Sequence, residues 1–453
     1  MQNSTAAAIS SPLGEGGISV IRISGDNALL IADKVFSAVS GKLICDQKGY
    51  TALFGAVYDN GGKIDDAVAL IFRAPHSYTG ENVVEISVHG GMFVAKKTLR
   101  AVLAAGAEAA GPGEFTKRAY LNGKLDLTQA ESVMGVISAG SETELKISSA
   151  ALGGKISSEI AEIKENLVGL AASIAAFADY PDEDLPELSV ESFGSTLKNI
   201  ENKLGAMLSS YDAGRVLREG IITAIVGKPN VGKSTLMNLL SRTERSIVTS
   251  VAGTTRDVIE ETVMAGEIML RLADTAGIHE TADEVEGVGV RLAKEKIEQS
   301  ELILAVFDSG EEFSPEDAEL LELIKNKKAI AVINKSDLEP KFNMARLGTM
   351  PKVFISAKTG VGKDNLTEKI AEVTGAAHLS ADSVVLGSER QRNCAQKAYS
   401  SIKEAAAALR LGQTVDAVGV CIDDALYALY QLTGERATNT VTDELFNRFC
   451  VGK

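Results

Sequence analysis

The chain has 453 residues, which exceeds one ordinary hydrophobic core and predicts about three domains. Its 61 acidic and 46 basic residues give a formal net charge of −15, so the molecule as a whole repels nucleic acid, and any such contact requires a local basic patch. Hydrophobic residues make up 45% of the chain and charged residues 24%, which is the composition of a soluble globular protein.

The four cysteines, Cys45, Cys394, Cys421 and Cys450, show neither CxxC spacing nor the cysteine and histidine spacing of a metal site. Reduced thiols are therefore expected. The first residues, MQNSTAAAISSP, lack a basic segment followed by an apolar one, and the longest strongly apolar stretch, Leu167–Ala178, is too short to cross a bilayer. We expect a cytoplasmic protein without membrane contact.

The secondary-structure pattern changes along the chain. Residues 1–120 combine short β-rich runs, such as ISVIRIS and DDAVALIF, with the helical stretch FVAKKTLRAVLAAGA, which indicates an α+β domain. Residues 121–217 are helical, residues 218–377 alternate strands and helices as in a mostly parallel sheet with helices on both faces, and residues 378–453 are helical again. We expect one discontinuous helical domain with an inserted α/β domain, although two separate helical domains would give the same pattern.

A phosphate-binding loop is predicted at GKPNVGKS, residues 227–234, which fits G-x-x-x-x-G-K-[ST] between a predicted strand and a predicted helix. Its glycines let backbone N–H groups surround phosphate oxygens. Lys233 can neutralise the β- and γ-phosphates, and the Ser234 hydroxyl is a predicted Mg²⁺ ligand.

Two further stretches complete the predicted phosphate site. DTAG follows the strand IMLRLA, so Asp274 can reach the metal through water, and Gly277 can turn its N–H toward the γ-phosphate. The preceding stretch VTSVAGTTRD offers Thr255 as a second hydroxyl on Mg²⁺, in a loop that becomes ordered when the γ-phosphate is present. The alternative interpretation is a solvated threonine-rich loop.

The stretch NKSD, residues 334–337, predicts guanine recognition at the carboxyl end of a strand. Asp337 can accept hydrogen bonds from the two N–H groups that guanine has and adenine lacks, while Asn334 reads the other edge and the stem of Lys335 covers the base. SAK, residues 356–358, follows the next strand and can offer a backbone amide to the guanine oxygen. The full set of predicted GTP contacts is Asn230, Val231, Gly232, Lys233, Ser234, Thr235, Thr249, Ser250, Val251, Ala252, Gly253, Thr254, Thr255, Asp274, Thr275, Ala276, Gly277, Asn334, Lys335, Ser336, Asp337, Ser356, Ala357 and Lys358.

The residue after DTAG is Ile278, whose aliphatic side chain cannot orient a water molecule. Water positioning must come from elsewhere, and no arginine is placed to offset the charge that develops during hydrolysis, so we expect a cation or a partner to supply it. Candidates for the water-positioning group are His279, Glu280, Asp283, Glu284 and Glu286.

These motifs are those of the translation-factor-like GTPases, and four flanking stretches narrow the resemblance: SPLGEGGISVIRISG, SYTGENVVEISVHGG, GPGEFTKRAYLNGKLDLTQAE and FCVGK. With them, essentially the whole chain resembles the MnmE (TrmE) family of tRNA modification GTPases. The resemblance implies an N-terminal α+β domain that dimerises and binds a folate one-carbon donor, 5-formyl- or methylene-tetrahydrofolate, a helical domain split in sequence, and an inserted Ras-like P-loop G domain.

The resemblance also implies an activity and partners. A homodimer would form a heterotetramer with the FAD-dependent MnmG (GidA) protein and add an aminomethyl or carboxymethylaminomethyl group to C5 of the wobble uridine of certain tRNAs. GTP hydrolysis would be stimulated by potassium and coupled to juxtaposition of the two G domains. Implied potassium contacts are Asn230, Thr249, Val251 and Thr254, implied Mg²⁺ ligands are Ser234 and Thr255, and the implied water-orienting residue is Glu286.

For folate, the resemblance implies contacts at Arg22, Glu85, Lys124 and Lys453, which would place residues from both ends of the printed sequence in one site. Without the resemblance, an arginine in a strand would more often be a salt-bridged surface residue. Cys450 matches the family's Cys-x-Gly-Lys stretch, where the thiol is either a reactive or positioning group or a small buried hydrophobe.

Two other functions fit parts of the sequence. A ribosome-assembly GTPase would have a similar G domain, but it would carry a basic RNA-binding domain that this acidic chain lacks. A folate-dependent methyl carrier with a regulatory G domain would share the N-terminal features. Candidate tRNA contacts, which are otherwise a solvated helix face, are Lys96, Lys97, Arg100, Lys117 and Arg118.

Overall fold

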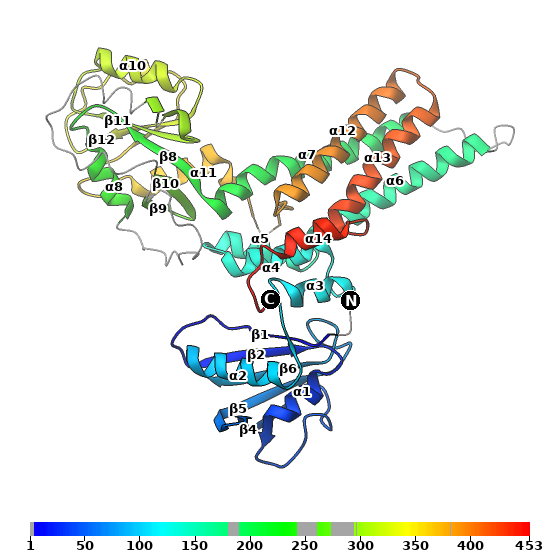
Figure 1. Ribbon diagram of the computed structural model, residues 1–453. Coiled ribbons are helices and arrows are strands. Elements are labelled where there is room, and N and C mark those ends of the chain that lie inside the picture. Colours follow the sequence, from blue (N-terminus) through cyan, green and yellow to red (C-terminus); the bar gives the residue numbers. More distant parts are fainter. Residues whose placement is uncertain (1–3, 180–189, 242–260, 273–293, 296, 381) are drawn as a thin grey trace. The chain divides into compact units, whose positions relative to one another are not determined.

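The computed structural model describes residues 4–179, 190–241, 261–272, 294–295, 297–380 and 382–453 (Figure 1). Its contacts divide the chain into two units. The first comprises Met1–Met134, Ser157–Lys198 and Asn393–Lys453, and the second comprises Gly135–Ile156 and Asn199–Arg392. Each unit therefore combines segments that are distant in sequence, and the predicted boundaries after residues 120, 217 and 377 stay predictions.

The first unit contains a seven-stranded sheet with the order β3-β4-β5-β6-β2-β1-β7. Its strand pairs are antiparallel except for the parallel pair β1 and β7. The predicted strands ISVIRIS and DDAVALIF are confirmed as β2 and as part of β5. The strands are β1 Ala6–Ile9, β2 Ile18–Ser24, β3 Phe36–Ala38, β4 Thr51–Asp59, β5 Gly62–Phe72, β6 Val83–His89 and β7 Glu108–Ala109.

Two helices, α1 (Ala28–Val35) and α2 (Met92–Ala104), pack on one face of this sheet. Ile21 of β2 and Ile86 of β6 belong to the buried cluster beneath them. Because side chains alternate along a strand, the polar neighbours of these residues on β2 and β6 point to the opposite face. The sheet thus separates a helix-covered face from a face that carries charged residues.

The remaining helices of the chain's helical stretches run from eight residues in α3 and α14 to thirty in α7, and the long helix α6 shows an apolar stripe. In α6, Ile160, Ile163 and Leu167 are fully buried at helical spacing. A Cβ on Gly419 of α13 would lie 3.4 Å from Ile174, so α6 and α13 approach closely. No described helix has the length and hydropathy needed to cross a bilayer. The helices are α3 Glu114–Leu121, α4 Leu127–Ser138, α5 Glu142–Leu152, α6 Lys155–Asp179, α7 Val190–Glu219, α12 Glu389–Arg410, α13 Val415–Thr433 and α14 Asn439–Phe446.

The second unit contains a six-stranded sheet with the order β13-β12-β11-β8-β10-β9, parallel except for β9. One buried cluster joins the sheet to α8 and α11, and a second joins its other face to α10, which confirms the predicted sheet with helices on both faces. The strands are β8 Ile221–Val226, β9 Glu261–Ala265, β10 Ile268–Leu272, β11 Leu302–Asp308, β12 Lys328–Asn334 and β13 Lys352–Phe354, and the helices are α8 Lys233–Ser241, α10 Pro315–Ile324, α11 Lys363–Thr374, η1 Met344–Leu347 and η2 Ala376–His378.

Candidate functional site

The predicted phosphate loop connects β8 to α8. Gly232 has a φ of 99°, and a Cβ at this position would lie 2.2 Å from Nδ2 of Asn334. Asn230 also has a left-handed backbone, with a φ of 63°. Only glycine fits at position 232, and the loop leaves the first N–H groups of α8 as the kind of donor array that binds phosphate.

The lysine of the phosphate loop is held by the loop itself. Nζ of Lys233 donates to the carbonyl oxygens of Gly227, at 2.9 Å, and Lys228, at 2.6 Å. Burial lowers the pKa of this ammonium. A phosphate beside it would favour the charged form, so the position of Lys233 agrees with its predicted role. Ser234, the predicted Mg²⁺ ligand, is exposed in the first turn of α8.

A buried ion pair fastens the phosphate loop to α10, and our sequence analysis missed it. Nζ of Lys228 lies 3.0 Å from a carboxylate oxygen of Asp317 and 3.1 Å from the hydroxyl oxygen of Ser314. Burial is the largest single influence and lowers the pKa of Lys228, but the hydrogen bonds to Asp317 and Glu311 and the charges of these two carboxylates together outweigh it, so the pKa is raised. The stretch SPED, with serine and aspartate three residues apart, signals the capping box that begins α10 and places this carboxylate.

Asn334 joins the phosphate loop to the predicted guanine loop. Its side chain is almost fully buried. The amide nitrogen donates to the carbonyl oxygen of Val231 at 2.8 Å, and the amide oxygen accepts from the N–H of Ala357 at 2.9 Å. Sequence analysis did not identify this bridging role. The predicted contact between Asn334 and the base stays a prediction.

Asp337 is exposed at the carboxyl end of the parallel sheet, as predicted from the NKSD stretch. A hydrogen bond from Ser356 lowers the pKa of its carboxyl group, and the charges of Lys358 and Lys335 act in the same direction. The carboxylate is therefore ionised at neutral pH and can accept two N–H donors. Nζ of Lys335 lies 2.5 Å from a carboxylate oxygen of Asp308, which holds the lysine stem beside this site.

Part of the predicted nucleotide site falls outside the described residues. In the described part, no group of three or more His, Cys, Asp or Glu side chains could hold a metal ion. Both predicted Mg²⁺ ligands, the water-orienting glutamate and every predicted potassium contact, Asn230 included, stay predictions. The residues outside the described part are Thr249, Ser250, Val251, Ala252, Gly253, Thr254, Thr255, Asp274, Thr275, Ala276, Gly277 and Glu286.

The first two predicted folate residues form a pair. Arg22 of β2 and Glu85 of β6 lie directly opposite each other in the sheet, and Nη2 of Arg22 is 2.8 Å from Oε1 of Glu85. The arginine is thus salt-bridged, which was the alternative drawn from the strand alone. The guanidinium also lies over the rings of Tyr78, at 5.3 Å, and Phe115, at 5.4 Å. These two aromatic side chains were missed as site residues, although Tyr78 belongs to the quoted SYTGE stretch.

The loop that carries Tyr78 brings Lys124 to the same region. Nζ of Lys124 is 3.4 Å from the carbonyl oxygen of Pro75, and a Cβ on Gly80 would lie 3.4 Å from Cγ of Lys124. The Tyr78 hydroxyl hydrogen-bonds to Thr116 of α3 at 2.9 Å, and burial raises its pKa. The side chain of Lys124 itself is exposed and available to an anionic ligand.

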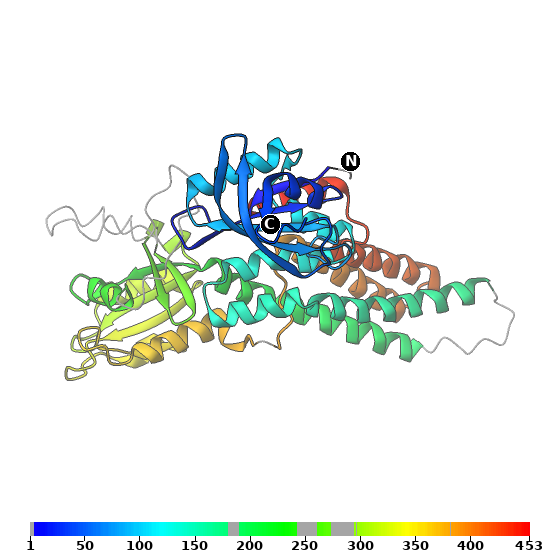
Figure 2. The same ribbon diagram turned by 90° about the horizontal axis from the view of Figure 1, so that it is seen from below.

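Residues 449–453 dock against the N-terminal sheet and α3, as Figures 1 and 2 show for the red and dark blue segments. The N–H groups of Gly113 and Phe115 donate to the carbonyl oxygens of Cys450, at 3.2 Å, and Lys453, at 3.0 Å. The Ser10 hydroxyl donates to the carbonyl oxygen of Gly452 at 2.9 Å. Lys453 is thus hydrogen-bonded to Phe115, the residue whose ring lies beneath the guanidinium of Arg22. The four predicted folate residues therefore lie in one region.

Two features of residues 449–453 explain why this segment is held in place. Phe449 is largely buried against Phe446, with ring centroids 5.3 Å apart. Gly452 has a φ of 96°, and a Cβ there would lie 2.3 Å from the carbonyl oxygen of Ile9. The thiol of Cys450 is exposed, which contradicts the interpretation as a buried hydrophobe and leaves its reactive or positioning role a prediction.

The five candidate tRNA contacts divide into two groups. Arg118 is bound by Glu81, at 3.2 Å, and Glu114, at 2.6 Å, in a largely buried network, and Lys117 pairs with Asp443 at 2.5 Å. These contacts give Arg118 and Lys117 structural roles. The other three, Lys96, Lys97 and Arg100, lie together on α2.

Two sequence profiles match most of the chain: "GTP-binding protein TrmE N-terminus" matches residues 5–124, and "MnmE helical domain" matches residues 127–450. The proteins named tRNA modification GTPase MnmE from Geotalea uraniireducens and Lactobacillus delbrueckii subsp. bulgaricus are 40% and 39% identical to this chain. Each alignment covers 99% of this chain, and 99% and 98% of the respective relative. The chain belongs to the MnmE family of tRNA modification GTPases.

Membership of the MnmE family confirms the resemblance drawn from the flanking stretches. Solved structures similar to part of the chain include the G domain of the T. maritima FeoB iron transporter, at 27% identity, and Era in complex with MgGDPNP and 16S ribosomal RNA nucleotides, at 35% identity. Both cover 34% of this chain, and the matches cover 98% and 56% of those chains, each with a TM-score of 0.25. Scores this low carry no argument, so the assignment to MnmE rests on the full-length relatives.

Proposed function

We propose that this chain hydrolyses GTP to drive the addition of an aminomethyl or carboxymethylaminomethyl group to C5 of the wobble uridine in tRNA. In this proposal it acts as a homodimer together with an FAD-dependent protein of the MnmG kind, and a tetrahydrofolate delivers the one-carbon unit. The observation that carries the proposal is the full-length relationship to MnmE proteins. The two groups of predicted site residues, around the phosphate loop and around Arg22, support it.

The phosphate and guanine loops have the properties that GTP requires. Gly232 leaves room for a backbone cradle, and Lys233 places an ammonium beside it. Asp337 provides an ionised acceptor at the carboxyl end of the sheet, which suits the paired N–H donors of guanine. Ser234 would hold Mg²⁺, which supplies positive charge to the phosphates when bound. The protein's own part is to bind, orient and neutralise the nucleotide.

The region around Arg22 has the chemistry to hold a folate. A pteridine ring is flat and apolar on its faces. It also carries amino and ring N–H groups that can donate hydrogen bonds to a carboxylate. Tyr78 and Phe115 offer aromatic surface, and Glu85 offers the carboxylate. Lys124 is free to attract the glutamate carboxylates of a folate, and Lys453 is anchored nearby through its backbone. Arg22 would orient Glu85 through the salt bridge.

The sheet face that carries Arg22 also supports the proposed homodimer. Ile18, Phe54 and Val68 are 66%, 61% and 36% exposed. Leu53 and Ala67, which precede Phe54 and Val68, belong to the buried cluster under α1 and α2. Because side chains alternate along a strand, Phe54 and Val68 point to the opposite face, as does Ile18 on β2. Exposed apolar side chains that gather on one sheet face mark an interaction surface. A full-length chain that sediments as a monomer would contradict this part of the proposal.

The direct test of the function is nucleoside composition. Transfer RNA from cells that lack this protein should lose the C5-substituted wobble uridine, and the gene for the intact chain should restore it. Purified chain with the FAD-dependent partner, GTP, tetrahydrofolate donor and unmodified tRNA should form the same nucleoside. Unchanged nucleosides in the deficient cells would refute the proposal, and a defect in ribosomal subunits alone would favour a ribosome-assembly GTPase.

The potassium proposal makes a separate prediction at Asn230. Hydrolysis of GTP by the intact chain should be faster in K⁺ buffer than in Na⁺ buffer, because a fitting cation offsets the charge that develops on the phosphates. Asn230→Ala should remove the difference by deleting an oxygen ligand. Alanine tolerates the left-handed φ of 63° less well than asparagine, so Asn230→Ala could also act through backbone strain. Asn230→Gly removes the same oxygen without strain and is therefore the control that separates loss of the ligand from strain. Equal rates in both salts for the intact chain would refute the cation model.

A further inference from the structure

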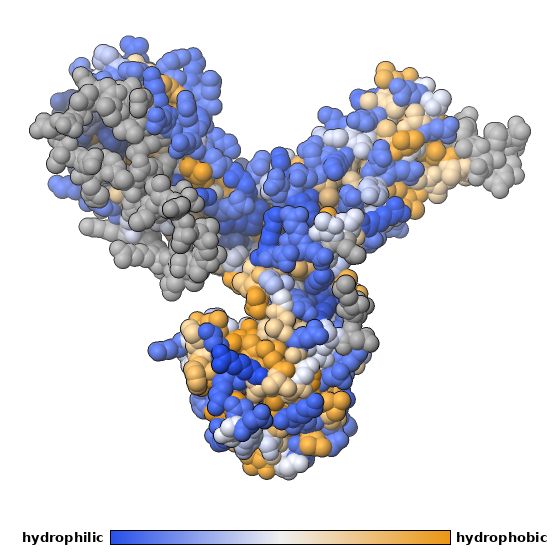
Figure 3. Space-filling model, viewed as in Figure 1, coloured by the Kyte–Doolittle hydropathy of each residue, from blue (hydrophilic) through white to orange (hydrophobic). Residues whose placement is uncertain are grey.

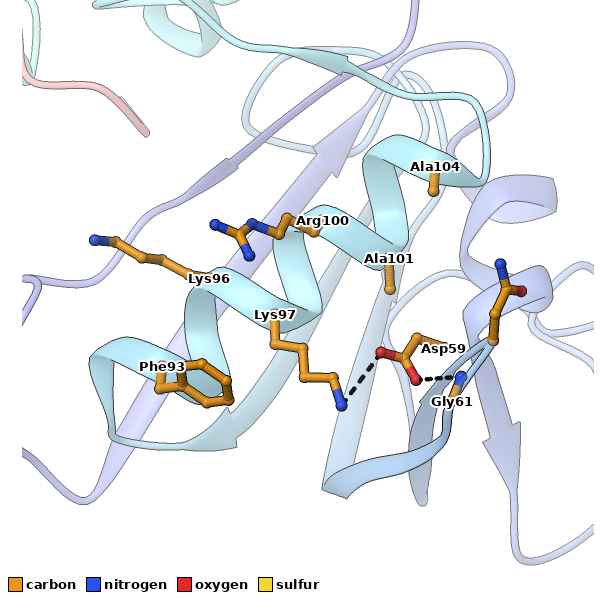
Figure 4. A pocket seen from close by; sticks show the side chains of 9 residues that line it. Asp59, Gly61, Phe93, Lys96, Lys97, Arg100, Ala101 and Ala104 are labelled. Atoms are coloured by element: carbon orange, nitrogen blue, oxygen red, sulfur yellow. Dashed lines mark hydrogen bonds and ion pairs between the residues drawn. The ribbon is translucent and has the colours of Figure 1, made fainter.

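The outer face of α2 forms a hollow of about 380 Å³ with the turn between β4 and β5. Phe93, Lys96, Lys97 and Arg100 recur at intervals of three and four residues, so they share one face of the helix. The turn contributes the residues 59–61. Figure 4 shows Lys97 directed to Asp59, while Lys96 and Arg100 extend away from it. We refer to these lining residues as the α2 surface.

Two cations of the α2 surface are free to bind an external anion. Nζ of Lys97 lies 3.3 Å from Asp59, and Asp59 is held in place by the N–H of Gly61 at 2.9 Å. Lys96 and Arg100 are exposed, and neither has an ion-pair partner among the described residues. The chain has a net charge of −15, whereas the α2 surface has three basic side chains and one carboxylate and is therefore locally positive.

The α2 surface also exposes an aromatic ring without a packing role in the domain. Phe93 is 78% exposed, and its neighbour Met92 is 48% exposed. Figure 3 shows hydrophobic and hydrophilic residues side by side on this part of the molecule. A free aromatic ring next to cationic side chains is the composition of surfaces that bind single-stranded nucleic acid, where bases stack on rings and cations follow the backbone.

The α2 surface is separate from the proposed folate region. The helix packs on the sheet face lined by Ile21 and Ile86, whereas Arg22 and Glu85 point to the other face. A ligand on α2 is therefore not a folate held by Arg22. The two sites are independent binding surfaces on opposite faces of one sheet.

We propose that the α2 surface binds an unpaired segment of RNA, with Lys96 and Arg100 on neighbouring phosphates and Phe93 stacked on a base. The inference rests on the proposed function, since a tRNA is the RNA that this chain would meet, and it adds the place of contact. One helical turn separates the two cations by about 6 Å along the axis, which suits successive phosphates of one strand. An anionic membrane fits less well, because lipid-binding segments cluster roughly 4–8 basic residues.

The test measures RNA binding by the full-length chain at several salt concentrations. The probes are an unmodified anticodon stem-loop and a fully paired duplex of equal length. Lys96→Ala combined with Arg100→Ala should weaken stem-loop binding at least tenfold at low salt. It should also reduce the slope of log K against log salt by roughly 1.4, at about 0.7 for each lost phosphate contact. Phe93→Ala should weaken stem-loop binding roughly tenfold, leaving the slope and duplex binding unchanged.

The matched control removes the same charge elsewhere in the first unit. Lys42→Ala combined with Lys48→Ala alters two exposed lysines of the loop between β3 and β4 and should change neither affinity nor slope. All variants should hydrolyse GTP and unfold thermally as the intact chain does, which verifies that both units fold. Phosphatidylserine vesicles serve as a third probe. Preserved RNA binding and slope in the α2 variants, or an intact chain that binds no stem-loop, would overturn the inference. It would also be overturned if the α2 substitutions weakened binding to the vesicles alone. If the variants bind normally while the intact chain still modifies tRNA, only this inference fails and the proposed function stands.

Discussion

An Asp337→Asn substitution should lower the affinity for GTP roughly a thousandfold and raise the affinity for xanthosine triphosphate. The carboxylate of Asp337 is ionised, since Ser356 lowers its pKa, and can accept both the ring N–H and the amino group of guanine. Losing two charge-assisted hydrogen bonds at about 1.5–3 kcal/mol each accounts for an effect of this size. An asparagine presents one acceptor and one donor, which matches the N–H and the added carbonyl of xanthine.

Equilibrium titration with fluorescent GTP and xanthosine triphosphate measures this exchange. Val361→Ala is a suitable control, because the Val361 side chain is 64% exposed and its backbone forms a β-bridge with Ser356, the residue that hydrogen-bonds to Asp337. It should leave both affinities unchanged. Equal preference of the intact chain and the Asp337→Asn variant for GTP would show that another residue selects the base. Because the pKa of Asp337 is depressed, GTP affinity should stay constant down to mildly acidic pH and fall only as the pH approaches the lowered pKa.

A Gly452→Val substitution should release residues 449–453 from the N-terminal sheet. The backbone at Gly452 has a φ of 96°, which a β-branched residue rarely adopts, and its Cβ would overlap the carbonyl oxygen of Ile9. Releasing the segment removes the hydrogen bonds that its carbonyl oxygens accept from the Ser10 hydroxyl and from the N–H groups of Gly113 and Phe115. We expect at least tenfold weaker binding of 5-formyl-tetrahydrofolate, less tRNA modification, and unchanged GTP hydrolysis.

The matched control for the tail is Val451→Ala. Val451 is 56% exposed, so losing its methyl groups should leave the segment docked and folate binding intact. Removing residues 450–453 altogether should reproduce the effect of Gly452→Val. If Gly452→Val bound 5-formyl-tetrahydrofolate as tightly as the intact chain, the tail would not belong to the folate site. A parallel loss of GTP hydrolysis would instead indicate general unfolding.

Side-chain contacts of the phosphate loop connect it to the predicted guanine loop and to α10. Asn334 spans from the phosphate loop to the loop of Ala357, and Lys228 ties the other side of the phosphate loop to Asp317. Both contacts are buried, where a hydrogen bond left without its partner is costly. A shift of the phosphate loop would therefore strain the predicted guanine loop, and these contacts hold the two predicted halves of the site at a set separation.

Much of the candidate nucleotide site was predictable because its parts are short continuous motifs. The loop at residues 227–234 lies between a strand and a helix as the pattern requires, and NKSD ends a strand at the expected sheet edge. Such motifs bind phosphate and base through backbone N–H groups and one or two side chains of neighbouring residues. Local sequence is enough to place them, and the same holds for the family assignment.

The tertiary structure decided which distant residues meet. Arg22 and Glu85 are 63 residues apart, and only the register of β2 with β6 makes them partners. Likewise, Ser10 and Gly452 are 442 residues apart and meet because the tail packs on the N-terminal sheet. No periodicity or motif encodes such pairs, since they depend on strand register and on packing between elements.

The sequence by itself thus determined the nucleotide motifs, the order of strands and helices, and the family. Tertiary structure decided that Arg118 pairs with Glu81 and Lys117 with Asp443, while Lys96 and Arg100 have no ion-pair partner in the described part of the chain. All four are basic residues on two helices, and the only local partner among these pairs is Glu114, four residues before Arg118. The difference arises because Glu81 and Asp443, from other elements, reach the basic side chains of α3. On the outer face of α2, Asp59 pairs with Lys97, and among the described residues no acidic side chain pairs with Lys96 or Arg100, which leaves these two available for binding.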